Sequence, residues 1–296
     1  MIKARLVNSP GSARRPPKEQ MLDIIASTIA GFPCAETSTT SSPVYDEGDS
    51  QPTPEVCAAP DAGPMCPPEN LVLNIPDGTT VANVATNLAT AGFRGLAIDM
   101  SSSHPSGTIA LAERLGKKSI RLIDAPVSGG QKKAAIGTLM IMVGGEKEDL
   151  DKIRTLLGCF GNIAHVGPLG AGHAMKALNN YVSAAGLLAS MQALATAQSF
   201  SIHPKTFAKV INGSTGRNNT TEVKLEPFII SRSYASGFSL QLMAKDVGIA
   251  SDLIVNAGFD APITGALNDY LMSAVEALDR DIDHTGLYEM VNPTKN

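Results

Sequence analysis

The sequence SIRLIDAPVSGGQKKAAIGTLMIMVGG (119–145) contains two short apolar runs, IRLIDAPV and TLMIMVGG, that are bounded by glycine. Runs of this length are typical of strands buried on both faces of a sheet. Because strands that alternate with helices are joined by parallel crossovers, the pattern predicts a doubly wound α/β sheet. The other expected strands are LVLNIP (71–76), LAIDM (96–100) and IAHVG (163–167), and the expected helices are TVANVATNLATAG (80–92), SGTIALAERLGK (106–117) and EKEDLDKIRTLLG (146–158).

The strand pattern stops at about residue 168, and a long uncharged segment follows. No charged residue lies between Lys176 and Lys205. Several Asn, Gln, Ser and Thr side chains make this segment too polar for a transmembrane span. We therefore expect a central helix about 40 Å long at ~1.5 Å per residue, in an all-α region that also packs against a second subunit. Residues 238–258 and 263–279 also show helical spacing.

Residues 1–69 differ in composition from the rest of the chain. Eleven of the 19 prolines lie in residues 1–70, and residues 41–70 have few large aliphatic side chains. Such a composition buries too little apolar surface to offset chain entropy, so we expect irregular structure with one short helix over 21–32. The predicted division is an atypical Pro-rich segment (1–69), an α/β domain (70–168) and an all-α domain (169–296).

Charge and ligand spacing exclude several classes of protein. Twenty-four Lys and Arg against 28 Asp and Glu leave a net charge of −4, which disfavours nucleic-acid binding. The cysteines form no CxxC pair and the histidines no ligand pair at helical spacing, so we expect no metal. The cysteine usage favours a cytoplasmic protein, whereas the basic, acid-free residues 1–18 leave a mitochondrial transit peptide as the alternative.

The segment DAPVSGG (124–130) closes an expected strand with a hydroxyl and two glycines. Open α/β sheets bind ligands at the carboxyl ends of their strands. There, Ser128 and the unobstructed backbone N–H groups of Gly129 and Gly130 suit a carboxylate. The alternative is a tight turn in which the two glycines only supply unusual φ angles.

Two pairs of polar residues interrupt expected apolar helices. Lys176 and Asn180 are four residues apart, so their side chains project from one helix face and reach one bound molecule. Partial burial would lower the pKa of Lys176 and fit its amine for proton transfer, unless the ammonium reaches water at the helix end. Lys245 and Asp246 interrupt LMAKDVGIA (242–250) in the same way, and their spacing is equally typical of an ion pair or a solvated face.

Four motifs together resemble, in order, the signatures of the β-hydroxyacid dehydrogenases, which include 3-hydroxyisobutyrate dehydrogenase, tartronate semialdehyde reductase and threonate dehydrogenase. The resemblance runs from about residue 70 to the end of the chain, and IPDG (75–78) and IDMSSSHP (98–105) match two further family segments. The four motifs are DAPVSGG (124–130), AAIGTLMIMVGG (134–145), GAGHAMKALNN (170–180) and LMAKDVGIA (242–250).

This resemblance implies a Rossmann-like domain followed by an all-α domain, a homodimer or homotetramer, and NAD- or NADP-dependent oxidation of a small 3-hydroxy acid. It also implies a role for each matching position, with Ser102 standing where family members normally carry Thr. The implied roles are catalysis by Lys176, substrate binding by Ser128, Gly129, Gly130 and Asn180, and cofactor binding by Ile75, Pro76, Ser102 and Lys245.

The sequence departs from the family in residues 1–70. The family's first strand, GxGxxG turn and helix have no match there, and the segment holds only 4 of the 27 glycines. Its length is close to that of the missing unit, so the segment looks substituted for it. We therefore expect weak dinucleotide binding, and the alternative function is a catalytically impaired homologue that acts as a folded dimeric or interaction protein.

Overall fold

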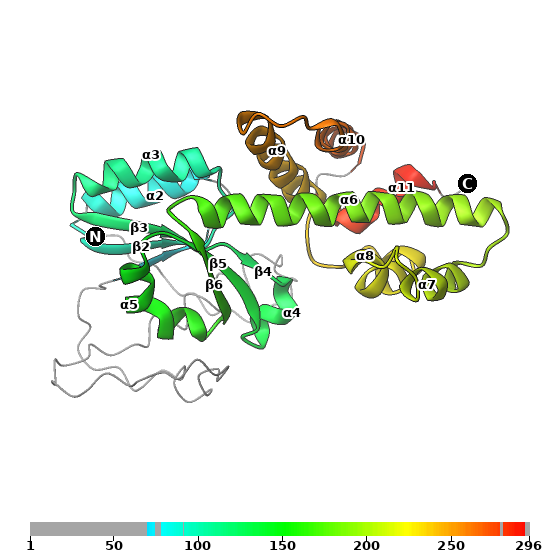
Figure 1. Ribbon diagram of the computed structural model, residues 1–296, viewed down its shortest axis with the longest axis horizontal. Coiled ribbons are helices and arrows are strands. Elements are labelled where there is room, and N and C mark those ends of the chain that lie inside the picture. The colour runs from blue at the N-terminus through cyan, green and yellow to red at the C-terminus, as the bar shows by residue number, and fades with distance from the viewer. Residues whose placement is uncertain (1–69, 75–77, 91, 279–280, 294–296) are drawn as a thin grey trace, which may run out of the picture.

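The computed structural model describes residues 70–74, 78–90, 92–278 and 281–293 (Figure 1). The short helix expected over 21–32, the irregular Pro-rich segment and the transit-peptide alternative all lie outside the described residues. The described chain forms a sheet covered by helices, followed by a helical region built on one long helix.

Three strands of the sheet run parallel and end together. Leu73, Asp99 and Asp124 are the last residues of these strands and lie in register with one another. The side chains that follow them therefore gather at the carboxyl end of the sheet, which we call its carboxyl edge. The strands of the sheet are β1 (Asn70–Leu73), β2 (Gly95–Asp99), β3 (Ile120–Asp124), β4 (Val127–Ser128), β5 (Leu139–Gly144) and β6 (Gly161–Gly167).

The expectation that all crossovers are parallel is wrong for β5. This strand runs antiparallel to β3 and β4, with Ser128 opposite Met140, and β6 pairs in parallel with β5. A parallel connection needs a segment long enough to return to the opposite end of the strands. Here β4 and the six-residue helix α4 (Gly130–Ala135) are the only elements between β3 and β5, so β5 runs back antiparallel beside β3 and β4. The sheet is therefore mixed.

Helices α2 (Gly78–Thr90) and α3 (Pro105–Gly116) lie on one side of the sheet and α5 (Lys147–Gly158) on the other (Figure 1). They confirm the three helices expected between strands. Pro105 starts α3 because its fixed φ suits a first helical turn, and the Nδ1 atom of His104 caps that turn by accepting from the Ser106 amide at 3.2 Å. The apolar faces of these helices close two cores, one on each face of the sheet.

Helix α6 (Ala171–Ser199) confirms the long central helix. Its 29 residues span about 44 Å at 1.5 Å per residue, and it runs from the sheet into the helical region (Figure 1). In the described part of the chain, no helix is long and apolar enough to cross a membrane. The cytoplasmic compartment, with the mitochondrion as the alternative, stays a prediction.

Other helices pack around α6 to form a third core, in which Leu187, Met191 and Leu194 of α6 are fully buried. Helices α9 and α10 confirm the two expected over 238–258 and 263–279, whereas the short elements were not expected. In chain order these elements are α7 (Pro204–Asn212), α8 (Asn219–Val223), η2 (Leu225–Ile230), α9 (Leu240–Asn256), α10 (Pro262–Ala277), η3 (His284–Leu287) and α11 (Tyr288–Val291).

Candidate active site

The first turn of α6 is attached to the carboxyl edge of the sheet by Asp124. One carboxylate oxygen accepts from the amide of Gly170 at 2.8 Å, and the other accepts from the amide of His173 at 2.7 Å. Gly172 allows the close approach, because a Cβ there would lie 2.3 Å from the carbonyl oxygen of Met142 on β5. These contacts fix where α6 begins and hence where Lys176 lies, one turn further along.

Four of the sequence-predicted residues meet around Asp246. Lys176 Nζ donates to Asn180 Oδ1 at 3.4 Å, and Asn180 Nδ2 donates to Asp246 Oδ2 at 2.6 Å. Ser102 Oγ, in the loop after β2, donates to Asp246 Oδ1 at 2.6 Å. The amine of Lys245 lies 3.3 Å from the same oxygen and also donates to the Ser102 carbonyl. We call these five residues the Asp246 network.

Lys245 and Asp246 form an ion pair, and the cofactor role of Lys245 stays a prediction. The Asp246 side chain is only 2% exposed, whereas that of Lys245 is 29% exposed. Sequence reasoning noted Asp246 but did not place it in the site. The signal was there, since a lysine and an aspartate that interrupt an apolar helix need a polar neighbour from another element.

Burial lowers the pKa of Lys176, with Asp246 opposing the shift and the positive charge of Lys245 adding to it. Lys176 is only partly exposed. Loss of its proton is therefore easier than for a lysine in water, and the neutral amine can accept a proton from an alcohol. Asn180 holds the amine from one side, so its position is restricted.

Ser128, Gly129 and Gly130 lie on β4 and at the start of α4. Gly129 and Gly130 have φ angles of 138° and 66°, and a Cβ at Gly129 would lie 2.8 Å from the Lys133 side chain. The turn itself therefore requires the two glycines, and their binding of a carboxylate stays a prediction. The Ser128 hydroxyl is partly exposed and makes no hydrogen bond within the described part of the chain, so it is accessible to a ligand. No hydrogen bond among the described residues joins it to the Asp246 network.

The predicted cofactor residues are only partly described, because Ile75 and Pro76 lie outside the described residues. Ser102 and Lys245 place a hydroxyl and an ammonium beside the carboxyl ends of parallel strands. Polar donors at this edge fit one end of a dinucleotide. A GxGxxG turn, which would hold the pyrophosphate, does not occur in the part of the chain that the structure describes.

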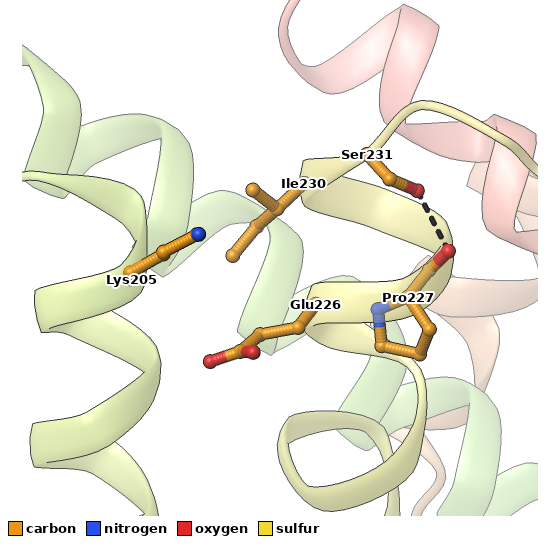
Figure 2. Close-up of a pocket in the computed structure, with 5 residues that line it drawn as sticks. All are labelled: Lys205, Glu226, Pro227, Ile230 and Ser231. Atoms are coloured by element: carbon orange, nitrogen blue, oxygen red, sulfur yellow. Dashed lines mark hydrogen bonds between the residues drawn. The ribbon is translucent and has the colours of Figure 1, made fainter.

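A surface hollow of about 430 Å³ lies between α7 and η2 (Figure 2). Lys205 and Glu226 point into it, and Ser231 Oγ donates to the Pro227 carbonyl at 2.6 Å at its rim. None of the Asp246 network lines this hollow, so we do not assign it to substrate. Among the described residues no group of three His, Cys, Asp or Glu side chains is placed to hold a metal ion.

Two family models match the two regions of this chain. The NAD binding domain of 6-phosphogluconate dehydrogenase matches residues 50–167, and the NAD-binding domain of NADP-dependent 3-hydroxyisobutyrate dehydrogenase matches residues 170–291. The chain belongs to the β-hydroxyacid dehydrogenase family. The match confirms the predicted family and fold class, and it confirms NAD or NADP as the cofactor class of these domains.

The curated relatives of this β-hydroxyacid dehydrogenase family member match the chain over only part of their own length. The 2-(hydroxymethyl)glutarate dehydrogenase of Eubacterium barkeri is 39% identical over 56% of each chain. The NAD-dependent L-serine dehydrogenase of Pseudomonas aeruginosa is 35% identical over 57% of this chain and 59% of its own. The probable mitochondrial 3-hydroxyisobutyrate dehydrogenase of Dictyostelium discoideum is 31% identical over 67% and 64%. The chain thus spans about 56 to 64% of the length of these relatives.

A solved structure shows the same two-part architecture. The 3-hydroxyisobutyrate dehydrogenase of Mycobacterium tuberculosis, solved with L-serine, superimposes with a TM-score of 0.68 at 29% identity. The superposition covers 75% of this chain and 79% of that one.

Proposed function

We propose that this protein is an NAD(P)-dependent oxidoreductase that interconverts a small 3-hydroxy acid and its aldehyde or keto acid. The observation that carries this proposal is the Asp246 network, in which a lysine with a lowered pKa lies beside an amide at the carboxyl edge of the sheet. The names of the relatives support a substrate with a hydroxyl one carbon removed from a carboxylate-bearing carbon. Substrates of the 3-hydroxyisobutyrate, glycerate and threonate type fit this description.

The proposed mechanism uses Lys176 for proton transfer. Bound nicotinamide supplies the hydride acceptor. In the oxidation direction, the neutral amine of Lys176 takes the proton of the substrate hydroxyl, and in reduction its ammonium returns a proton to the carbonyl oxygen. Asn180 orients both the amine and the substrate, while Asp246 orients Asn180 through a 2.6 Å hydrogen bond. Ser102 and Lys245 hold the cofactor from the loop after β2 and from α9.

The substrate carboxylate is assigned to Ser128, Gly129 and Gly130. Ser128→Ala is expected to raise the KM for the hydroxy acid, because the hydroxyl without an internal partner donates to the carboxylate. The loss is about 1 to 3 kcal/mol, the usual range for a hydrogen bond to a charged group. Steady-state kinetics measure the change, with Ser273→Ala on α10 as a control that should leave KM unaltered. An equal loss of dinucleotide affinity would place Ser128 on the cofactor instead.

The function is tested by titrating the full chain with NADH and NADPH and by assaying turnover of 3-hydroxyisobutyrate, glycerate and threonate. Turnover of any of the three supports the proposal. Cofactor binding without turnover of any of the three would contradict these substrates. Failure to bind either cofactor favours the alternative, a catalytically impaired homologue that acts as a folded dimeric or interaction protein, because residues 1–70 then do not replace the family's GxGxxG unit. A graft of that unit should then restore binding.

We also propose that the protein forms a homodimer or homotetramer through α6. Met175, Leu178 and Val182 are 42%, 37% and 68% exposed and lie on one face of this helix at spacings of three and four. An exposed apolar row on a long helix suits a second copy of the same chain. Val182→Asp should shift the protein toward monomer in analytical ultracentrifugation, whereas Val210→Asp on α7 should not. An unchanged mass in both variants would remove α6 from the interface.

A further inference from the structure

Three titratable side chains are buried together where the sheet meets the first turn of α6. Asp99 ends β2, Asp124 ends β3, and His173 lies on α6; each is at most 1% exposed. His173 Nε2 lies 3.8 Å from Asp99 Oδ2, and His173 Nδ1 lies 3.8 Å from Asp124 Oδ2. Within the described part of the chain, His173 is the only Lys, Arg or His side chain within 4 Å of either carboxylate. None of the three belongs to the Asp246 network.

Each carboxylate holds a different part of the candidate site. Asp99 accepts from the Ser101 amide at 2.9 Å and from the Ser103 hydroxyl at 3.5 Å, so it shapes the loop that carries Ser102. Asp124 accepts from the first amides of α6, the helix that carries Lys176. His173 lies between the two carboxylates and is thus the link between the loop and the helix.

The contacts around His173 restrict where its ring protons lie. The Thr108 hydroxyl is 3.3 Å from the His104 carbonyl and 2.7 Å from His173 Nδ1. Because the hydroxyl has one proton, it either donates to Nδ1 or donates to the carbonyl and accepts from Nδ1. Nε2 has no hydrogen-bond partner and faces the Asp99 carboxylate. An unprotonated Nε2 would direct a lone pair at a negative charge, so the contact with Asp99 favours a proton on Nε2.

The two buried carboxylates favour a positively charged ring between them. Asp99 and Asp124 are neighbours in register, and two buried carboxylates without a cation repel each other. Burial raises the pKa of Asp124, while His173 and the bonds from backbone amides lower it. Loss of the imidazole would therefore favour a protonated Asp124, which is a weaker acceptor for the amides of α6.

We propose that His173 is a positioning residue, an imidazolium shared by Asp99 and Asp124 that joins the loop carrying Ser102 to the helix carrying Lys176. We call the contacts of His173 with Asp99 and Asp124 the joint. The effect of His173 on turnover rests on the proposed function, whereas the joint does not, because it consists only of contacts within the chain.

The charge of His173 is tested in the wild-type protein without ligand. Proton–nitrogen spectra of the histidine side chains at pH 7.5 distinguish an imidazolium, with two protonated nitrogens, from a neutral ring with one. His173→Gln assigns the signal by its disappearance. Where that variant does not fold, His203→Asn and single substitutions of the other histidines assign it by elimination. Two protonated nitrogens on His173 are expected, and one would overturn the proposal.

The joint is tested by hydrogen exchange. In His173→Gln, the amides of Ser101 and Gly170 should exchange at least about tenfold faster together, because both are bonded to the carboxylates that His173 links. Amides of α10 should keep their wild-type rates. His203→Asn on the surface is the matched control and should change neither set. Unchanged exchange at Ser101 and Gly170 in a folded His173→Gln variant would refute the joint.

The positioning role is tested by the ratio of kinetic effects in the active enzyme. His173→Gln should lower kcat about 10- to 100-fold, because a small displacement of Lys176 misaligns proton transfer. KM should change less than kcat, since the substrate carboxylate is assigned to β4 and its turn and only Asn180, among the proposed substrate residues, lies on α6. An unaltered kcat with faster exchange would show that the joint does not position Lys176. An inactive wild-type protein would contradict the proposed function only, because the spectra and the exchange rates still decide the joint.

Discussion

Lys176→Ala is expected to lower kcat by about 10² or more while leaving the affinity for the hydroxy acid largely intact. The reason is that Lys176 carries the proton in the proposed reaction, and loss of a general acid or base has an effect of this size. Single-turnover and steady-state assays in both directions measure it. Lys205→Ala, which removes an exposed lysine from α7, is the control and should retain wild-type kcat.

The pH dependence gives the same assignment a second test. Burial lowers the pKa of Lys176, so the neutral amine forms at a pH below the ordinary lysine range. The oxidation rate should therefore rise with pH through this lowered pKa, and the reduction rate should fall, because reduction needs the ammonium. Lys176→Arg should lose the oxidation activity, since arginine stays protonated. A near-normal kcat in Lys176→Ala would remove Lys176 from proton transfer.

Gly172→Ala is expected to destabilise the fold by about 2 kcal/mol or more, as overpacking of a rigid site does. The added Cβ would lie 2.3 Å from the Met142 carbonyl, 2.8 Å from Asp124 Oδ2 and 3.0 Å from the Asp124 carbonyl. Two of these neighbours are backbone atoms, so α6 must move away from the sheet. Thermal and urea unfolding measure the loss, and activity should fall with it because Lys176 moves with the helix.

Gly265→Ala on α10 is the matched control for this prediction. No atom lies within 4 Å of a Cβ built there, and alanine is the better helix former, so the variant should be as stable as wild type or slightly more stable. Equal stability of Gly172→Ala and Gly265→Ala would show that the first turn of α6 is not closely packed on β5.

The sequence predicted most of the architecture because the relevant signals are local. Apolar runs bounded by glycine located the main strands, and 28 uncharged residues between Lys176 and Lys205 located α6. Lys176 and Asn180 could be paired from their spacing alone, since a helix brings residues four apart onto one face. The direction of β5 was missed, because strand direction depends on how far the connecting segment reaches rather than on the composition of the strand.

Sequence alone thus determined the fold class, the family and the residue types of the candidate site. Only the tertiary structure decided that Ser102, Asn180 and Lys245 meet at Asp246, and that Asp99, Asp124 and His173 are buried together. These residues lie on segments far apart in the chain, and strand register and helix docking bring them together. The pKa of a buried group depends on which charge lies opposite it. That neighbour is determined by packing between elements rather than by sequence spacing within one element.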